Sequence, residues 1–465
     1  MDDEIFSAQV LSKLPLADAT WRVLHHVMAD AWLSDLWERK RGRAYERVLG
    51  FSTLAHLIAD ALVEHDGSGR QAFERAQEKS ALPVSVGSAY EKLGNLPQPL
   101  SEAMLEEGTQ RLHELLPERP PVEPFPLSAC WNGYEVFGAD GKAIKHVQRL
   151  LKALRGLQAG ILGARASVAL NLRTGTAVGM VSHLDGEAGE AALTEQLLSM
   201  MAAAAGDKPW VVVLDRLYCN LTFPSRVLAA GGHFVIRYSS NTQFTADPAR
   251  PAQQRCDAQG RRIVQEWGRL GKSAGVRALY VRRITLHLGE GKVISVFTDL
   301  LDEEAYPAED VLAMYRARWG IETVFQQITS VFSLKHLIGS PPRAVLFQLS
   351  FCLLLYNTLQ VARAHLAFHQ KCEAAKISNQ KLFYDLKRQM ISVSELVEVP
   401  QLLDLLGEGS TSAELREYLG ESLRGTWSVR WWKSPSSGGG GHKKVKQRVL
   451  GNHTSTYRAL QKAKE

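Results

Sequence analysis

The sequence predicts an α/β protein in which helices flank a mixed β-sheet, an all-β segment is inserted into the sheet domain, and helical regions stand at both ends. Residues 1–117 alternate amphipathic helical patterns with polar breaks and contain no convincing strand. Residues 129–240 then read as strand, strand, strand, helix, strand, helix and strand, an alternation that is typical of an α/β domain. Residues 241–305 read as consecutive strands between turns that contain Gly or Pro, so we expect an all-β insertion that is not part of the sheet.

Changes in composition divide the chain into segments. A proline-rich stretch, ERPPVEPFPLS, reads as a linker between the N-terminal helices and the sheet domain. The tail after Gly438–Gly441 holds seven Lys or Arg against one Glu, so it is either a basic arm for phosphates or a solvated end. The expected segments are a helical N-terminal domain (1–117), a linker (118–128), the first part of the sheet domain (129–240), the β insertion (241–305), the second part of the sheet domain (306–370), a helical C-terminal region (371–435) and a flexible basic tail (436–465).

The composition is typical of a folded protein in a reducing compartment. The 465 residues are 45% hydrophobic and 22% charged, and so long a chain exceeds what one hydrophobic core serves. Five scattered cysteines exclude a fully paired disulfide framework and offer no CxxC metal spacing. The N-terminus lacks a basic n-region, and the longest apolar stretch, residues 344–356, is too short to cross a bilayer. We therefore expect a cytoplasmic protein without a membrane segment, whose net charge of +6 favours polyanionic partners.

Three acidic residues stand apart from the other carboxylates. WNGYEVFGADG reads as a strand that ends at Asp140, and PWVVVLD reads as a buried strand that ends at Asp215. YRARWGIETVFQQITSVF reads as one helix, in which spacings of three and four residues align Tyr315, Arg318 and Glu322 on one side. The apolar residues of this helix are expected to face a core: Trp319, Ile321, Val324, Phe325, Ile328 and Phe332.

Each of these acids alone has an ordinary interpretation. Asp140 can be a turn residue before a glycine, and Asp215 can be a cap after its strand. The Arg318–Glu322 pair can be a surface ion pair worth about 0.3–0.5 kcal/mol. Together they indicate a metal site, because carboxylates at the ends of buried neighbouring strands repel one another unless a cation binds them. Mg²⁺ and Mn²⁺ favour such oxygen ligands, and two ions about 3.5–4 Å apart would serve both oxygens of a phosphodiester displacement.

These residues resemble the DDE transposases of the insertion sequence 4 family, bacterial enzymes that move DNA by cut and paste on an RNase H-like fold. The resemblance spans roughly residues 130–360. It rests on Asp140 in ADG, Asp215 in VVVLDRLY and the sequence YRARWGIETVF, which matches the family's signature of Tyr, Arg and Glu in register.

The resemblance implies an RNase H-like mixed sheet and a catalytic site on it. In that site Asp140, Asp215 and Glu322 would bind two Mg²⁺ ions, with Mn²⁺ as a substitute. Tyr315 and Arg318 would hold the terminal phosphate of the element's DNA end. This assignment explains why one side of the signature helix is polar: it would border the scissile bond.

Further basic residues are candidates for DNA contact. Lys142 and Arg149 belong to a basic run after the first aspartate, which is either a DNA-facing rim or a solvated helix face. The family signature has a lysine where this sequence has Thr329, so we expect weaker or different phosphate contacts there or from Lys335. The short helix that starts near Ser85 reads as an ordinary connector rather than as a DNA-reading helix.

Other prominent residues are assigned structural roles. Asp185, Glu187 and Glu190 lead into a helix, whose dipole favours acids in the first turn. Trp267 in the β insertion is expected in a core rather than stacked on a flipped base. Neither set is needed for the metal site.

We therefore expect a transposase that binds the terminal inverted repeats of a DNA element, cleaves phosphodiester bonds at its ends and joins them to target DNA. Its partner is double-stranded DNA, as transposon ends and as target, and the joining of two ends predicts a homodimer in the DNA complex. The expected location is the bacterial cytoplasm, on the nucleoid when DNA is bound. Two alternatives stay open: a metal-dependent nuclease on the same fold that does not join strands, and a decayed DNA-binding relative, which the missing lysine favours and the intact acids oppose.

Overall fold

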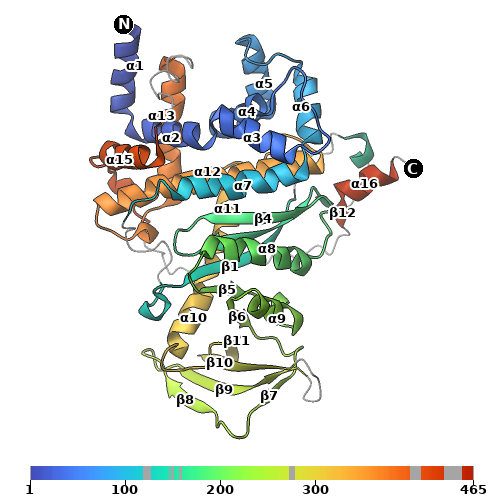
Figure 1. Ribbon diagram of the computed structural model, residues 1–465, viewed down its shortest axis with the longest axis vertical. Coiled ribbons are helices and arrows are strands. Elements are labelled where there is room, and N and C mark those ends of the chain that lie inside the picture. Colours follow the sequence, from blue (N-terminus) through green and yellow to red (C-terminus); the bar gives the residue numbers. More distant parts are fainter. Residues whose placement is uncertain are drawn as a thin grey trace.

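A computed structural model describes residues 2–118, 127–145, 147, 151–155, 157, 160–271, 278–397, 410–433 and 453–463. At its centre is a ten-stranded mixed sheet with helices on both faces and along one edge (Figure 1). The hydrogen-bonded order is β4-β3-β1-β5-β6-β11-β10-β9-β7, and β8 pairs with β9 beside this path. The strands are β1 Glu135–Ala143, β3 Arg165–Asn171, β4 Ala177–His183, β5 Trp210–Leu214, β6 His233–Arg237, β7 Phe244–Ala246, β8 Gln253–Cys256, β9 Arg262–Leu270, β10 Leu279–Gly289 and β11 Lys292–Thr298.

The first five strands of this order form the RNase H-like part of the sheet. β1 pairs antiparallel with β3, and β3 pairs antiparallel with β4. β1 and β5 pair in parallel, as do β5 and β6. Helix α8 (Glu190–Ala205) precedes β5, and α9 (Thr222–Ala229) precedes β6, as crossovers between parallel strands require. The predicted RNase H-like mixed sheet flanked by helices is therefore confirmed.

Strand β5 contributes to two hydrophobic cores at once. All five of its residues are buried. Val211 and Val213 pack into the core that also contains α10, α11 and α12, whereas Val212 and Leu214 pack into the core under α8 and α9. Successive side chains of a strand point to opposite faces of the sheet. The residue that follows β5, Asp215, is therefore expected on the face of Val211 and Val213.

The predicted β insertion is all-β, but it is not separate from the sheet. β11 pairs antiparallel with β6, with Val296 opposite Arg237 and Thr298 opposite Val235. Strands β7 to β11 therefore extend the same sheet beyond β6 (Figure 1). Without β11, the edge of β6 would present a row of unpaired backbone groups. The expectation that residues 241–305 lie outside the sheet is wrong for this reason.

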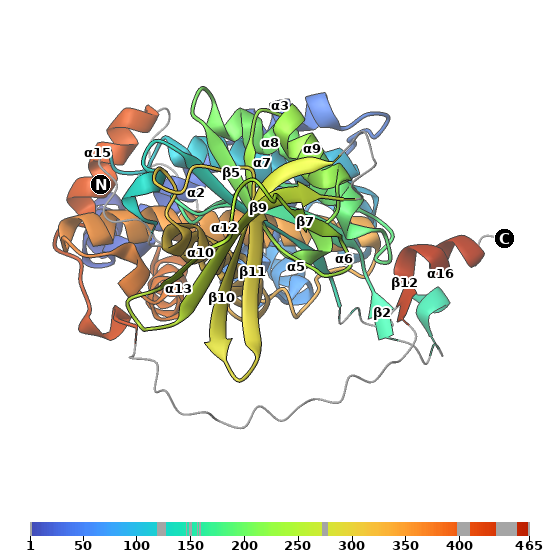
Figure 2. The same cartoon turned by 90° about the horizontal axis from the view of Figure 1, so that it is seen from below.

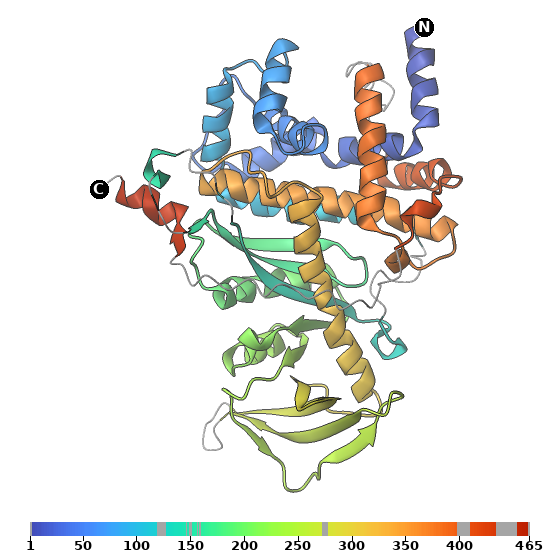
Figure 3. The ribbon, with the colours of Figure 1, turned by 180° about the vertical axis from the view of Figure 1, so that it is seen from behind.

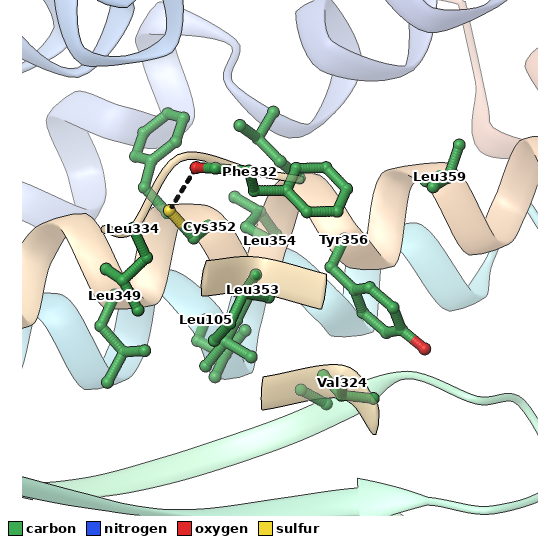
Figure 4. Packing of buried hydrophobic residues seen from close by; sticks show 14 of the residues in the cluster. Leu105, Val324, Phe332, Leu334, Leu349, Cys352, Leu353, Leu354, Tyr356 and Leu359 are labelled. Carbon is green, nitrogen blue, oxygen red and sulfur yellow. Dashed lines mark hydrogen bonds between the residues drawn. The ribbon is translucent and has the colours of Figure 1, made fainter. Parts of the chain in front are cut away.

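Two helices run behind the sheet. α10 (Ala308–Ala317) and α11 (Trp319–Ser330) lie nearly end to end and lead from the insertion strands toward α12 (Figure 3). Cys352 of α12 donates a hydrogen bond from Sγ to the carbonyl oxygen of Phe332, just beyond α11, at 3.3 Å (Figure 4). This contact fixes the end of α11 against the central helix of the molecule.

Helix α12 (Pro342–His369) is that central helix. It starts with proline at its first helical position, where a missing N–H costs nothing. The apolar stretch of residues 344–356 is only its first half, and the whole helix is long and apolar enough to cross a membrane by length and composition. Its apolar window is entirely buried inside the structure, where Leu353 and Leu349 pack near Leu105 of α7 (Figure 4). We therefore describe α12 as a core helix.

The N-terminal part of the chain is helical. Residues 2–118 contain helices and no strand, as their pattern predicts. Ser85 caps α6 by accepting a hydrogen bond from the backbone N–H of Ser88 at 3.1 Å, close to the predicted helix start. These helices and those that follow α12 are α1 Asp2–Lys13, α2 Pro15–Val27, α3 Asp30–Lys40, α4 Phe51–Val63, α5 Gly69–Glu78, α6 Val86–Asn95, α7 Gln98–His113, α13 Asn379–Leu396 and α15 Ser412–Ser422.

The C-terminal end of the predicted flexible tail is folded. β12 (His453–Ser455) pairs in parallel with β2 (Gly160–Leu162), and α16 (Thr456–Lys462) follows it. Figure 2 shows this small unit to the side of the main sheet. Arg458 of α16 binds Asp185 at 2.7 Å and also binds Glu187. The prediction of a flexible tail is therefore wrong for residues 453–463, because strand pairing and ion pairs hold them, while residues 436–452 lie outside the described residues.

Candidate active site

The two aspartates occupy matching positions on neighbouring parallel strands. β1 and β5 pair with Val136 opposite Val211 and Gly138 opposite Val213. Two residues further along each strand come Asp140 and Asp215. By strand alternation both side chains take the face of Val211 and Val213, which is the face covered by α11. The register of the sheet thus puts both aspartates on the same face, just past the end of the β1–β5 pairing.

Strand β1 does not end at Asp140, contrary to the sequence prediction. It continues to Ala143 because its antiparallel pairing with β3 goes on, with Asp140 opposite Val168 and Ala143 opposite Arg165. Only the parallel pairing with β5 stops, at Gly138. Asp140 therefore lies just past the last β1–β5 pair, where β1 keeps only its pairing with β3.

Asp215 directly follows β5 and begins a short 3-10 helix, Arg216–Tyr218. Its Oδ1 accepts a hydrogen bond from the backbone N–H of Leu217 at 2.6 Å. The cap interpretation is therefore correct as a description of local structure. It does not exclude a second role, because the other carboxylate oxygen has no recorded partner among the described residues.

Glu322 comes from α11, and the predicted single helix is in fact two. Arg318 separates α10 from α11. Its Nη2 donates to Glu322 Oε1 at 2.9 Å, and its side chain is 5% exposed against 38% for Glu322. The arginine of this pair is buried and only the glutamate is partly exposed, so the pair is not a fully solvated surface ion pair.

Trp319 does not face the core, contrary to the sequence prediction. Its side chain is 60% exposed, whereas Ile321, Val324 and Ile328 are buried. At about 100° per residue, Trp319 lies on the opposite side of α11 from these three residues. Composition suggested a buried tryptophan, but helix geometry excludes it.

Asp140 is largely buried and lies near other charged groups. Burial raises the pKa of Asp140 to about 6, and the negative charges of Glu190 and Glu322 add to this rise. The N–H of Gly141, which donates to Asp140 Oδ1 at 2.9 Å, and the charge of Arg318 act in the opposite direction. A carboxylate in such surroundings is the kind of group that a cation stabilises.

The donor set fits a hard divalent cation in its chemistry but is not closed around one. Within the described ranges, no three His, Cys, Asp or Glu side chains gather closely enough to hold a metal ion as they stand. One recorded partner occupies each carboxylate: Gly141 N–H, Leu217 N–H and Arg318. Each acid thus keeps an oxygen for a metal, and closing the site requires side-chain adjustment.

The predicted DNA contacts fall into three groups. Tyr315 Oη and Arg318 Nε are buried and have no hydrogen-bond partner among the described residues. Lys142 Nζ donates to Thr329 Oγ1 at 3.1 Å, so a lysine from β1 reaches the position where the family signature has its own. Lys335 is exposed beyond α11, and Arg149 lies outside the described residues.

Sequence reasoning treated Glu190 as a helix-start acid only and did not predict its contact with β1. Glu190 is the first residue of α8, and its carboxyl group lies where a Cβ on residue 141 would be. The available signal was Gly141 itself, because a glycine inside a strand often marks a close approach by another group. By contrast, the predicted core position of Trp267 is confirmed: it is fully buried and donates from Nε1 to Leu301 O at 3.0 Å.

The fold defines a protein of the RNase H-like class, and comparison with known proteins gives the family. Residues 131–358 match the model of the transposase DDE domain, so this part of the chain is a transposase DDE domain. The matched residues include Asp140, Asp215 and Glu322. The match does not single out the insertion sequence 4 family, which stays a prediction.

Two individual proteins are similar to this chain. "Putative transposase y4zB" of Sinorhizobium fredii is 25% identical over 152 residues, which are 32% of this chain and 42% of that protein. The chain thus matches less than half of that relative's length. A cryo-EM structure of the piggyBac transposase synaptic complex with hairpin DNA aligns with a TM-score of 0.40 at 11% identity, over 90% of this chain and 88% of that one.

Proposed function

We propose that this protein is a cut-and-paste DNA transposase that cleaves phosphodiester bonds at the ends of a DNA element and joins those ends to target DNA. One observation carries the proposal. Asp140 and Asp215 stand in register on adjacent parallel strands, and the charge of Glu322 acts on Asp140 from the helix that covers the same face. This arrangement, in a part of the chain that matches the transposase DDE domain, supports a shared role for the three acids.

In this proposal the three acids hold divalent metal. Asp140, Asp215 and Glu322 would be the ligands of two Mg²⁺ ions, or of Mn²⁺ in their place, since carboxylate oxygens suit both metals. Bound ions would supply positive charge to the attacking and the leaving oxygen of the phosphodiester. Arg318 orients Glu322 through their ion pair and keeps a buried positive charge beside the reacting phosphate.

In this proposal, residues near the three acids would contact the DNA. The unpartnered Tyr315 hydroxyl and Arg318 Nε would donate to the phosphate at the element's end, since buried donors without partners are costly unless a ligand satisfies them. Lys142 would supply a positive charge at the position of Thr329, with Lys335 further out. The helices of residues 1–117 would recognise the terminal inverted repeats, and two protomers would hold the two ends.

The test is cleavage of a duplex that carries the element's native end, in Mg²⁺. We expect Asp140→Ala, Asp215→Ala and Glu322→Ala each to abolish cleavage while the proteins stay folded and bind the duplex. Glu304→Gln, which removes an exposed acid in the turn before α10, should cut like the wild type. Undiminished cutting by any of the three alanine variants would remove that residue from the site.

Joining is tested separately from cutting. We expect the wild-type protein to insert pre-nicked element ends into a target plasmid, since the same site can use a 3′-hydroxyl in place of water. Cleavage without joining would instead identify a metal-dependent nuclease. Binding without cleavage in Mg²⁺ or Mn²⁺ would identify a decayed relative.

A further inference from the structure

A chain of buried hydroxyl groups connects strand β3, which pairs with β1, to the start of α8. Ser167, Thr194 and Tyr218 are fully buried. Ser167 Oγ contacts Thr194 Oγ1, which lies 2.7 Å from the Tyr218 hydroxyl, and Tyr218 donates to Glu190 Oε1 at 3.0 Å. Each hydroxyl can donate to the next in one direction, so that the chain ends on the carboxylate of Glu190.

The Glu190 carboxylate lies against the backbone next to Asp140. A Cβ built on Gly141 would overlap the Cγ, Cδ and Oε2 atoms of Glu190. Any other residue at position 141 would therefore push this carboxylate away. Glycine permits an approach to β1 that the rest of the strand does not.

Two contacts hold the Glu190 carboxylate at this place. Tyr218 donates to its Oε1 at 3.0 Å, and its Oε2 lies against Gly141, the residue that follows Asp140. Burial raises the pKa of Tyr218, so its hydroxyl stays protonated and remains a donor. The hydroxyl chain thus holds a negative charge next to the candidate metal ligand.

An acid that only stabilises the start of a helix needs neither a buried hydroxyl donor nor a close glycine. An acid in the first turn is stabilised by the helix dipole wherever it faces solvent. Glu187 is also a glutamate and is close in sequence, but it pairs with Arg458 instead. Unlike Glu187, Glu190 combines a buried tyrosine donor with a close approach to the glycine beside Asp140.

We propose that Glu190 is a fourth carboxylate of the candidate active site, a positioning residue that Tyr218 holds against Gly141 to strengthen cation binding at Asp140. This inference rests on the function proposed above, because it assumes that Asp140 binds the metal. Glu190 lies on the α8 side of β1, whereas Asp140 faces α11, so Glu190 acts through its charge and through the position of the strand. Outer groups of this kind typically change metal affinity by about 10- to 100-fold.

The test is the affinity of the full-length protein for Mn²⁺ alone, measured by titration calorimetry without DNA. We expect Glu190→Gln to raise the dissociation constant about tenfold and Tyr218→Phe to raise it less. Asp140→Asn should raise it at least as much as Glu190→Gln, and Glu187→Gln should leave it unchanged. Thermal unfolding of each variant shows whether the fold is intact.

A double-mutant cycle covers the case in which Glu190→Gln does not fold. Gly141→Ala keeps the N–H that bonds Asp140 but displaces the Glu190 side chain, so it should weaken Mn²⁺ binding as Glu190→Ala does. The two changes together should weaken it no further, since the alanine then meets no carboxylate. Additive losses would contradict the proposed contact.

The outcomes separate the two proposals. Wild-type affinity in Glu190→Gln and Gly141→Ala, together with loss in Asp140→Asn, would overturn the role of Glu190 and leave the metal site standing. Unchanged affinity in Asp140→Asn would overturn the metal site, and with it the inference, whatever the Glu190 variants do.

Discussion

Burial and two neighbouring carboxylates raise the pKa of Asp140 to about 6, from an ordinary value of 3.8. In the absence of metal, the folded protein therefore binds a proton at Asp140 more tightly than the unfolded chain does. Between about pH 4 and pH 6 the folded state holds more protons, so the contribution of this group to the free energy of unfolding falls as the pH rises. Above pH 6 the ionised carboxylate destabilises the metal-free protein.

Asp140→Asn should remove this penalty. We expect it to raise the free energy of unfolding by about 1–3 kcal/mol above pH 6 in a metal-free buffer, with the gain vanishing below about pH 4. The amide oxygen can still accept the Gly141 N–H, so no hydrogen bond is lost. Denaturant unfolding at pH 4, 5, 6 and 7.5 in EDTA measures the difference. A gain that does not depend on pH would show that charge is not its cause.

Tyr315 allows function to be separated from stability. Its hydroxyl is buried without a partner among the described residues, and such a group costs free energy in the folded state. Tyr315→Phe should therefore leave the unfolding midpoint unchanged or raise it. If the hydroxyl donates to a DNA phosphate, cleavage of the element end should fall by about 10- to 100-fold, the worth of a hydrogen bond to a charged group. Tyr384→Phe, at a tyrosine that is 62% exposed, is the control.

At the scale of single residues, the sequence pointed to three of the candidate acids but not to Glu190. Asp140, Asp215 and Glu322 could be chosen because strand-end acids and a periodic polar row are visible in one dimension. Glu190 could not, since its significance depends on where α8 crosses β1. The signal was Gly141, but a glycine beside an aspartate is also a common turn sequence.

At the scale of elements, the order of strands and helices in the sheet domain could be predicted, but their ends could not. β1 runs past Asp140 because of its pairing with β3, and pairing partners are not visible in the strand itself. The helix over the acids divides at Arg318, and Gly320 two residues later was the one local signal in the sequence that could have indicated the break. Boundaries of this kind are set by tertiary contacts rather than by local propensity.

One buried polar residue of helix α12, Asn357, forms hydrogen bonds with the backbone of the edge strand β4. Asn357 Oδ1 accepts from the N–H of Ala177, and its Nδ2 donates to Ala177 O and to Thr109 Oγ1, at 2.8–2.9 Å. β4 is the edge of the sheet, so these bonds take the place of the next strand. Ser350, on the same helix, is equally buried but has no partner for its hydroxyl among the described residues.

The two positions on α12 should respond in opposite ways. Asn357→Leu leaves the N–H of Ala177 unpaired, while Ala177 O keeps the hydroxyl of Thr109 at 3.1 Å, so we expect a loss of about 1–3 kcal/mol in the free energy of unfolding. Ser350→Ala removes an unpaired hydroxyl and should be neutral or slightly stabilising. Urea unfolding of both variants beside the wild type checks this. Equal losses would mean that packing volume, not hydrogen bonding, decides the stability at this helix.

At the scale of the whole molecule, segments that lie far apart in the sequence pair with each other in two places. The β insertion extends the main sheet, and the C-terminal end returns to pair with β2. Both features depend on contacts between segments far apart in the sequence, so neither strand alternation nor a run of basic residues could predict them. The returning end also binds the loop before α8: Ser455 Oγ accepts from Gly186 N–H at 3.2 Å, and Arg458 pairs with Asp185. It thus helps to fix the start of the helix that carries Glu190.

Reversing the charge of Arg458 tests whether its ion pairs hold the C-terminal unit, residues 453–463, in place. Arg458→Glu would place a third acid beside Asp185 and Glu187, so the C-terminal unit should open more often. We expect hydrogen exchange to rise several-fold in residues 160–162 and 453–455, which form the β2–β12 pair, while β1, β3 and β5 keep their protection. Lys462→Glu makes the same charge change on the same exposed helix without breaking a recorded ion pair, and it should leave exchange unchanged. Equal effects of the two variants would mean that net charge, rather than the Arg458 contacts, holds the C-terminal end in place.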